Sequence, residues 1–291
     1  NHQATLNRIW PEYGPLVQAW WRENPLRSKT ERLARRGSPG GGVLHVLHRQ
    51  SLIGGTERVT RLLVESLARW IRQTLVYPGS TNSAWCDFET RADGDVRELM
   101  LNRRWILPST RISSHGADLR CLHSERALAQ LIEGARPDIL HFHHMLHWDS
   151  LLLPALARTL GCRVVISVHD FWFNCPQYNQ IEFSTGTPCG RTRARADPRC
   201  ADCLGGHANT PVRPESYIPA RHGLLRNMLE SADMLVVPSR FVRQKLVDAF
   251  PGIDRERIRQ VPHGVKLPDR PARPAPDSEY AVANLGGDLL L

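Results

Sequence analysis

The sequence lacks a long hydrophobic run, a secretory signal pattern and the familiar nucleotide-binding loops, and each absence excludes a class of protein. No stretch of about eighteen or more apolar residues occurs, so no helix is predicted to span a membrane. No charged segment followed by an apolar run marks a signal peptide. Neither GxGxxG nor a Walker A loop is present, which leaves phosphate binding without its most specific sequence evidence.

The charge is basic, with 38 Lys and Arg against 29 Asp and Glu, for a net charge of +9. Arginine supplies nearly all of the excess, and its planar fork suits bidentate contacts with phosphate or carboxylate. Such a chain favours anionic partners, among them nucleotides and acidic membrane surfaces. No basic stripe with interleaved aromatics is evident, and no helix-turn-helix or zinc-finger spacing fits. We therefore expect no nucleic acid as a partner.

Apolar segments alternate with helical patterns along the chain, which predicts an α/β protein with a doubly wound parallel sheet. The most informative segment is 164–168, where β-branched residues without alternation indicate a strand buried on both faces. His169 and Asp170 follow it, at the edge where open α/β sheets bind ligands. Further strands are expected at 43–47, 74–77, 105–107, 138–142, 234–237 and 258–261, and one at 279–285 would begin a second domain. Helices are expected after residue 57, over a segment that includes 127–132, over about 149–160, around 223–231 and from 239 to about 250.

Three regions are predicted. Residues 1–42 form an N-terminal arm and linker, either packed on the main domain or built as an aromatic, basic interfacial helix. Residues 43–267 form a Rossmann-like domain. Residues 268–291 are a proline-rich linker and the start of a second domain. Because the chain begins without Met and stops in an apolar run, we predict that it is a piece of a longer polypeptide.

Two histidine-bearing segments are candidate sites. His141, His143, His144 and His147 follow a predicted strand, and alternation sends His141 and His143 to one face. Four histidines in seven residues could bind a metal, but their spacing does not fit HExxH. We therefore expect one or two of them to line a polar cleft, the others to be exposed, and no metal to bind. His169 could donate a hydrogen bond to a sugar hydroxyl or a phosphate, or take part in proton transfer. The alternative is a core histidine satisfied by the backbone.

Two turns are predicted at the same edge of the sheet. The glycines of Gly54-Gly55-Thr56-Glu57 could bring free helix amides to a phosphate or carboxylate, or simply make a structural turn. Ser239 follows a strand and begins a helix. A glycine turn with His263 and Gly264 ends the last strand, just before the proline-rich linker.

Seven cysteines occur in the chain, and an odd count without a secretory signal favours a reducing compartment. Four of them cluster after His169-Asp170, at Cys175, Cys189, Cys200 and Cys203. The Cys-x-x-Cys pair is half of a usual tetrahedral zinc site, so a structural Zn²⁺ could order this loop. Disulfides and free thiols are the alternatives.

Five short motifs follow one another along the main domain: Gly54-Gly55-Thr56-Glu57, Arg136-Pro137-Asp138-Ile139-Leu140-His141, Val168-His169-Asp170, Pro238-Ser239-Arg240-Phe241-Val242 and Val261-Pro262-His263-Gly264-Val265. In this order and spacing they resemble the N-terminal half of a family 4 glycosyltransferase, of the retaining GT-B type. The cysteine loop is similar to that of a subset of the family.

The resemblance implies two Rossmann-like domains with an active site between them. The N-terminal domain would mainly hold the acceptor, and the missing C-terminal domain would mainly hold the nucleotide sugar. The implied reaction is transfer of a sugar from a nucleotide-sugar donor to a glycan or lipid-linked acceptor, with retention, in surface polysaccharide synthesis. The leaving diphosphate would be stabilised electrostatically, without a catalytic metal. The fragment alone is expected to be inactive.

The resemblance also assigns residues to the site. His169 would contact the donor sugar near the reacting carbon, with Asp170 as a positioning residue beside it. The backbone of Gly54 and Gly55 would approach the donor's phosphates or sugar. The other cleft residues implied are Glu57, His141, His143, Ser239, Arg240, His263 and Gly264.

A second function stays open, that of a non-catalytic sugar- or partner-binding domain that retains the half-fold. For location we expect the cytoplasm. The positive charge and the pair Trp20 and Trp21 favour peripheral attachment at the inner face of the cell membrane.

Overall fold

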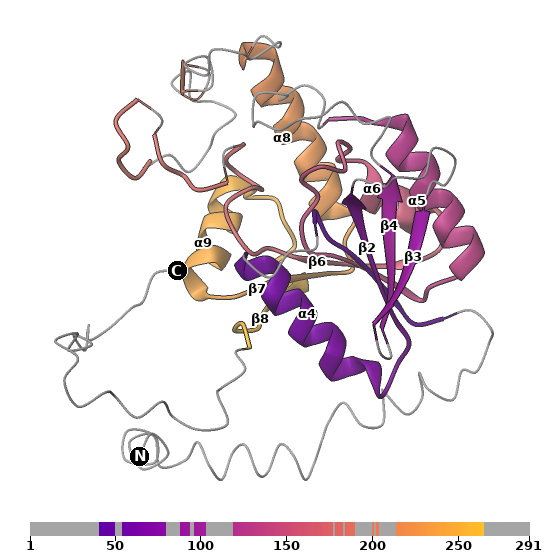
Figure 1. The fold of residues 1–291 in the computed structure, drawn as a ribbon. Helices are drawn as coiled ribbons and strands as arrows, with labels where there is room; N and C mark the ends of the chain where they lie inside the picture. The colour runs from indigo at the N-terminus through magenta and orange to yellow at the C-terminus, as the bar shows by residue number, and fades with distance from the viewer. Residues whose placement is uncertain are drawn as a thin grey trace, which may run out of the picture.

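The computed structural model describes residues 41–49, 54–79, 88–93, 96–102, 119–176, 178–182, 184–189, 200, 202–203 and 214–264. These residues build one eight-stranded sheet in the order β3-β4-β2-β1-β5-β6-β7-β8 (Figure 1). The strands are β1 (Val43–Val46), β2 (Gln73–Gly79), β3 (Phe88–Asp93), β4 (Val96–Asn102), β5 (Ile139–Phe142), β6 (Arg163–Ser167), β7 (Met234–Val237) and β8 (Ile258–Gln260).

The sheet is parallel except at one edge, where β3 pairs antiparallel with β4. From β1 the chain builds outward through β2 and β4, and then returns to place β5 on the other side of β1. The strand order therefore reverses between β1 and β5. In an open α/β sheet such a reversal leaves a crevice at the carboxyl ends of the strands, where ligands bind.

Helices cover both faces of the sheet, as a doubly wound fold requires. They are α4 (Gly55–Ala68), α5 (Leu122–Ala135), α6 (Leu153–Thr159), α8 (Pro214–Glu230) and α9 (Arg240–Ala249), with a short 3₁₀ turn at Arg255–Arg257. Buried side chains of α5, α6, α8 and α9 share one core cluster. The α4 helix instead places Val64 in a separate cluster with residues of β2 and β4. Alternate residues of each strand point to opposite faces, so the two clusters lie on the two sides.

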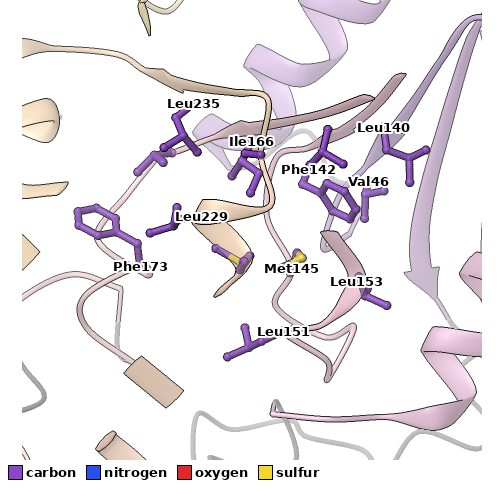
Figure 2. Close-up of a cluster of buried hydrophobic side chains, with 14 of the residues drawn as sticks. Val46, Leu140, Phe142, Met145, Leu151, Leu153, Ile166, Phe173, Leu229 and Leu235 are labelled. Atoms are coloured by element: carbon purple, nitrogen blue, oxygen red, sulfur yellow. The ribbon is translucent and has the colours of Figure 1, made fainter. Parts of the chain in front are cut away.

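The larger cluster forms where the central strands meet the helices (Figure 2). Val46, Leu140 and Ile166 come from three neighbouring strands, and Leu229 of α8 belongs to the same cluster. Trp148 is fully buried, and its Nε1 donates a hydrogen bond of 2.8 Å to the Leu47 carbonyl. This bond joins the segment after β5 to the end of β1, so the two loops at the reversal are held together.

Most predicted elements are present within one or two residues, with three differences. The predicted helix at 149–160 begins only at Leu153, because His147 and Asp149 adopt left-handed backbone angles (φ 70° and 55°) that no α-helix contains. The α8 helix begins earlier than the predicted helix at 223–231, because it continues through Pro219, a residue that disfavours a helix interior. The sequence pattern left residues 80–100 unplaced, and the structure places the antiparallel strands β3 and β4 in this region.

Some predictions lie outside the described residues. These are the strands at 105–107 and 279–285, all but the last two residues of the arm at 1–42, and the linker and domain start at 268–291. The domain boundaries remain predictions. Among the helices that the structure describes, none has the length and apolar character needed to cross a membrane.

The buried position of Leu140 gives a direct test of the sheet centre. Leu140 is fully buried on β5, so Leu140→Ala should lower the free energy of unfolding by about 2–5 kcal/mol through lost burial and a residual cavity. Leu122 begins α5 and is 56% exposed, so Leu122→Ala should change stability by less than about 0.5 kcal/mol. Urea unfolding of both variants measures the difference, and equal losses would contradict this placement of β5.

Candidate functional site

The carboxyl edge of the sheet gathers histidines from four strands. His45 on β1 lies directly beside His141 on β5 in the parallel register. His143 follows β5, His169 follows β6 and His263 follows β8. Because all these strands are parallel, their carboxyl ends meet at one edge, and the sequence-predicted residues His141, His143, His169 and His263 come together there.

Four of these rings form a continuous chain of hydrogen bonds. His45 Nδ1 lies 3.0 Å from His143 Nε2, and His143 Nδ1 lies 3.2 Å from His169 Nε2. His169 Nδ1 in turn lies 3.1 Å from His263 Nε2. The inner end is anchored by Gln73, whose Oε1 is 2.6 Å from His45 Nε2. The chain thus runs from the buried centre of the sheet to His263, which is exposed.

These imidazoles are held in the neutral form. Burial lowers the pKa of His45 to about 4, against a smaller opposing effect of the bond to Gln73. Burial, together with the neighbouring rings of His263 and His144, lowers the pKa of His169 to about 3. Burial and the adjacent histidines also place the pKa values of His141 and His143 well below their ordinary value. Neutral rings each offer one N–H and one lone pair, which is what a chain of this kind requires.

Asp170 forms hydrogen bonds within its own loop and with His144. Its Oδ1 accepts a hydrogen bond of 2.8 Å from the Trp172 backbone N–H, and its Oδ2 lies 3.2 Å from His144 Nε2. Burial alone would raise the pKa of Asp170, but His144 and the hydrogen bonds lower it overall. The carboxylate therefore fixes the loop after β6 and orients His144, as a positioning residue does.

The glycine turn before α4 holds a carboxylate of its own. Glu57 is 2% exposed, and its carboxylate folds back so far that a Cβ on Gly54 would lie 2.0 Å from Glu57 Oε2. Arg49 Nε donates to Glu57 Oε1 at 2.7 Å, and His48 Nε2 lies at 3.5 Å. Gly54 is thus required by Glu57. A Cβ on Gly55 would meet no heavy atom of the described residues within 4 Å, so this side of the turn is open.

The remaining predicted residues lie at the same edge with different tasks. Ser239 caps α9, its Oγ accepting from the Val242 N–H at 3.2 Å, so its hydroxyl already has a helix partner. Arg240 opens the same helix and is exposed, and Gly264 follows His263 in an exposed segment. Beside His169, a small cavity of about 30 Å³ lies between the end of β6 and α8, lined mainly by apolar side chains such as Trp172 and Met228.

Comparison with protein families decides the assignment. The model of Glycosyltransferase Family 4 matches residues 53–268, which is most of the chain. The chain belongs to glycosyltransferase family 4. The match spans the edge that carries His141, His143, His169 and His263, and it confirms the resemblance found in the five sequence motifs. No sequence among the curated proteins matches the chain.

Solved structures similar to this family 4 chain are longer enzymes. One is described as trehalose-6-phosphate from E. coli bound with UDP-2-fluoro glucose, at 14% identity and a TM-score of 0.39, and it covers 71% of this chain and 42% of its own. Two α,α-trehalose-phosphate synthases (UDP-forming) follow. The synthase of Burkholderia vietnamiensis is 14% identical with a TM-score of 0.38, and the match covers 71% of this chain and 42% of that one. The synthase of Burkholderia xenovorans, in complex with glucose-6-phosphate, is 13% identical with a TM-score of 0.39, and the match covers 72% of this chain and 42% of that one. The family 4 chain therefore spans less than half the length of these structures.

One group in the described part of the family 4 domain has the composition of a metal site. His45, His141 and His143 each place a ring nitrogen within 4.8 Å of the others. However, both ring nitrogens of His45 and of His143 already have hydrogen-bond partners, and His141 Nε2 lies 2.8 Å from Ser167 Oγ. A metal would have to break the histidine chain in order to bind.

Among the described residues, none of the clustered cysteines forms a disulfide. Cys175, Cys189, Cys200 and Cys203 are all half-buried. In the part of the chain that the structure describes, none of them belongs to a group of three potential metal ligands. Backbone bonds order part of the loop instead, with the Cys189 N–H donating to the Gln180 carbonyl at 2.6 Å. The structural zinc remains a prediction, as do the disulfide and free-thiol alternatives for the protein in solution.

Sequence reasoning missed the two inner members of the histidine chain, His45 and Gln73. His45 lies in a predicted strand among apolar residues, and Gln73 immediately precedes the strand predicted at 74–77, so each looks like an isolated polar position. A signal was present, because β1 reads Val-Leu-His-Val and β5 reads Ile-Leu-His-Phe. Only the pairing of β1 with β5, however, brings the two histidines to the same level.

The depressed pKa values predict acid sensitivity of the family 4 domain. An unfolded histidine binds a proton near pH 6.5, whereas folded His45, packed beside the titratable rings of His141 and His143, resists one down to about pH 4. Because the unfolded chain binds more protons, stability is complete above that unfolded pKa and falls as the pH drops through it. At about pH 5 the loss due to His45 is about 2 kcal/mol.

His45→Gln removes this titration. The difference in unfolding free energy between about pH 8 and about pH 5 should be smaller in the variant by about 2 kcal/mol. Urea unfolding at both pH values measures it, and the comparison at the higher pH separates any packing loss from the proton linkage. An unchanged difference would show that His45 is not held neutral by the fold.

Proposed function

We propose that the chain is the acceptor-side domain of a retaining glycosyltransferase, which transfers a hexosyl group from a nucleotide-sugar donor to a glycan or lipid-linked acceptor. The observation that carries the proposal is the family match over 53–268, combined with the gathering of His143, His169 and His263 at the sheet edge where the strand order reverses. The donor-binding domain of the same polypeptide would complete the site, so this chain alone would be inactive.

In this proposal the residues of the edge bind and orient substrates. His169 contacts a sugar hydroxyl near the reacting carbon, and because its Nδ1 is bonded to His263, the sugar either displaces His263 or bonds through it. The open side of Gly55 admits the donor close to the α4 turn, beside the buried carboxylate of Glu57. Asp170 holds the loop that carries His169. The leaving diphosphate would be stabilised by positive groups and amides around the cleft.

The structure of the site suits a reaction that needs no strong acid on this domain. The histidines are neutral, and Asp170 and Glu57 are both engaged with partners. This fits a retaining transfer in which the domain orients the two hydroxyl-bearing substrates. Surface polysaccharide synthesis in the cytoplasm, with the enzyme attached peripherally to the inner face of the membrane, is the setting that we infer from the family and from the net charge of +9.

His169→Ala in the complete enzyme tests the proposal. Loss of a hydrogen bond to the reacting sugar should lower turnover about a hundredfold, measured as release of nucleoside diphosphate across a panel of nucleotide sugars. The control is His222→Asn. His222 lies on α8, and its Nε2 bonds the Ala249 carbonyl of α9, so this variant should keep its activity. Full turnover by a folded His169→Ala protein would remove His169 from the site.

The alternative is a binding domain that keeps the fold without catalysis. It predicts that the complete polypeptide binds a sugar or a partner but releases no nucleoside diphosphate from any donor in that panel. Such a result, with the protein folded and nucleotide sugar bound, would favour the alternative over transfer.

The cysteine loop has its own test. If a structural zinc orders it, elemental analysis should find about one zinc per chain, and Cys203→Ser should lower that content because a tetrahedral site loses a ligand. Cys162→Ser is the control, because the Cys162 thiol is buried against the Pro137 carbonyl away from the loop. Absence of stoichiometric metal, together with reactive thiols, would reject zinc.

A further inference from the structure

The histidine chain has a fixed inner end, which is the side-chain amide of Gln73. Its Nε2 donates to the Ile71 carbonyl at 2.9 Å, and its Oε1 faces His45 Nε2 at 2.6 Å. Rotating the amide by half a turn would set oxygen against oxygen at Ile71 and remove a hydrogen bond from a fully buried group. The backbone carbonyl therefore determines which atom Gln73 presents to His45, and that atom is an acceptor.

One acceptor at the inner end determines the tautomer of every ring that follows. His45 must carry its proton on Nε2 to bond Gln73, which leaves its Nδ1 as an acceptor. His143 must then donate from Nε2, and its Nδ1 accepts from His169 Nε2. By the same rule His169 Nδ1 accepts from His263 Nε2. All four neutral rings are Nε2–H tautomers, and the direction of the chain is the same at each step.

The rings are placed so that this order can persist. His45 and His143 stack with centroids 5.3 Å apart at 23°, and His141 packs on His143 at 3.9 Å. His45 is 0% and His143 is 3% exposed, so water cannot replace a lost bond cheaply. A ring with the wrong tautomer would face a lone pair with a lone pair, or an N–H with an N–H, in a buried place.

We propose that Gln73, His45 and His143 are positioning residues, which hold His169 and His263 as Nε2–H tautomers so that the sheet edge meets a ligand with an unprotonated Nδ1. The ligand group that this nitrogen recognises is a hydroxyl that donates a hydrogen bond. A phosphate oxygen, itself an acceptor, is disfavoured there. The assignment of this hydroxyl to a sugar rests on the proposed function. The tautomer assignment does not depend on that function.

The consequence holds whether or not His263 stays in place. With His263 bonded to His169, the nitrogen open to a ligand is His263 Nδ1, which has no hydrogen bond to any described residue. If a substrate displaces His263, the exposed nitrogen is His169 Nδ1. Both are acceptors under the same rule, so the substrate meets the same chemistry.

The first experiment reads the tautomers in the unmodified protein. Ring nitrogens that carry a proton and those that do not resonate in separate ranges, and long-range ¹H–¹⁵N correlation of histidine-labelled full chain at neutral pH distinguishes them. We expect His45, His143, His169 and His263 to be protonated on Nε2 alone. A proton on Nδ1 of His169 or His143 would overturn the proposal, whatever its cause, including a metal bound to His143 Nε2.

The second experiment removes the acceptor at the inner end. Gln73→Met keeps the size of the side chain without its oxygen, so His169 should lose its single tautomer and show both. Gln244→Met makes the same change at an exposed position of α9, where Gln244 Nε2 donates to Asp248 Oδ1, and should leave the pattern intact.

Persistence of the wild-type pattern in a folded Gln73→Met protein would show that Gln73 does not set the tautomers. If that variant does not fold, the spectrum of the unmodified protein decides the question, because a proton on Nδ1 of any of the four rings contradicts the proposal. None of these measurements uses turnover, so their outcome is independent of the nucleotide-release assay that tests sugar transfer.

Discussion

The structure depends on the parallel pairing of β1 with β5. This pairing reverses the direction in which the sheet grows, and it sets His45 level with His141 in a register that the hydrophobic pattern fixes. A slip of either strand by one residue would send its histidine to the opposite face and its apolar neighbours out of the core. The energy that keeps this register therefore comes from buried side chains such as Leu44 and Leu140, which point to the face opposite the histidines. Burial of these apolar side chains thus determines where the histidines of the polar edge lie.

Polar groups buried at such an edge must satisfy one another. Neutral imidazoles are well suited, because each is both a donor and an acceptor and several can be linked in a line. Carboxylates at the same edge solve the problem differently. Asp170 is satisfied by a backbone amide and His144, and Glu57 by Arg49 and His48. At this edge the two carboxylates are therefore paired, and the histidine chain ends at the exposed ring of His263.

Much of this arrangement could be predicted from local pattern. The unalternating run before His169 and Asp170 placed that pair at a strand end, and the Ser239 cap and the α4 turn were identified by residue type. The late start of α6 could not be predicted, because it follows from left-handed backbone at His147 and Asp149. The role of Gly54 was also hidden. Its small size serves the folded-back carboxylate of Glu57, a contact that sequence spacing suggests only weakly.

The sequence by itself determined the α/β class, the strand ends that carry His143, His169 and His263, and the family, because these depend on residue type, periodicity and order along the chain. Only the tertiary structure decided that His45 and Gln73 belong with them. Gln73 begins β2 and His263 follows β8, so the two are far apart in sequence. Hydrogen bonds between distant segments exist only once the sheet order is set, and sheet order is a property of packing that no local pattern contains.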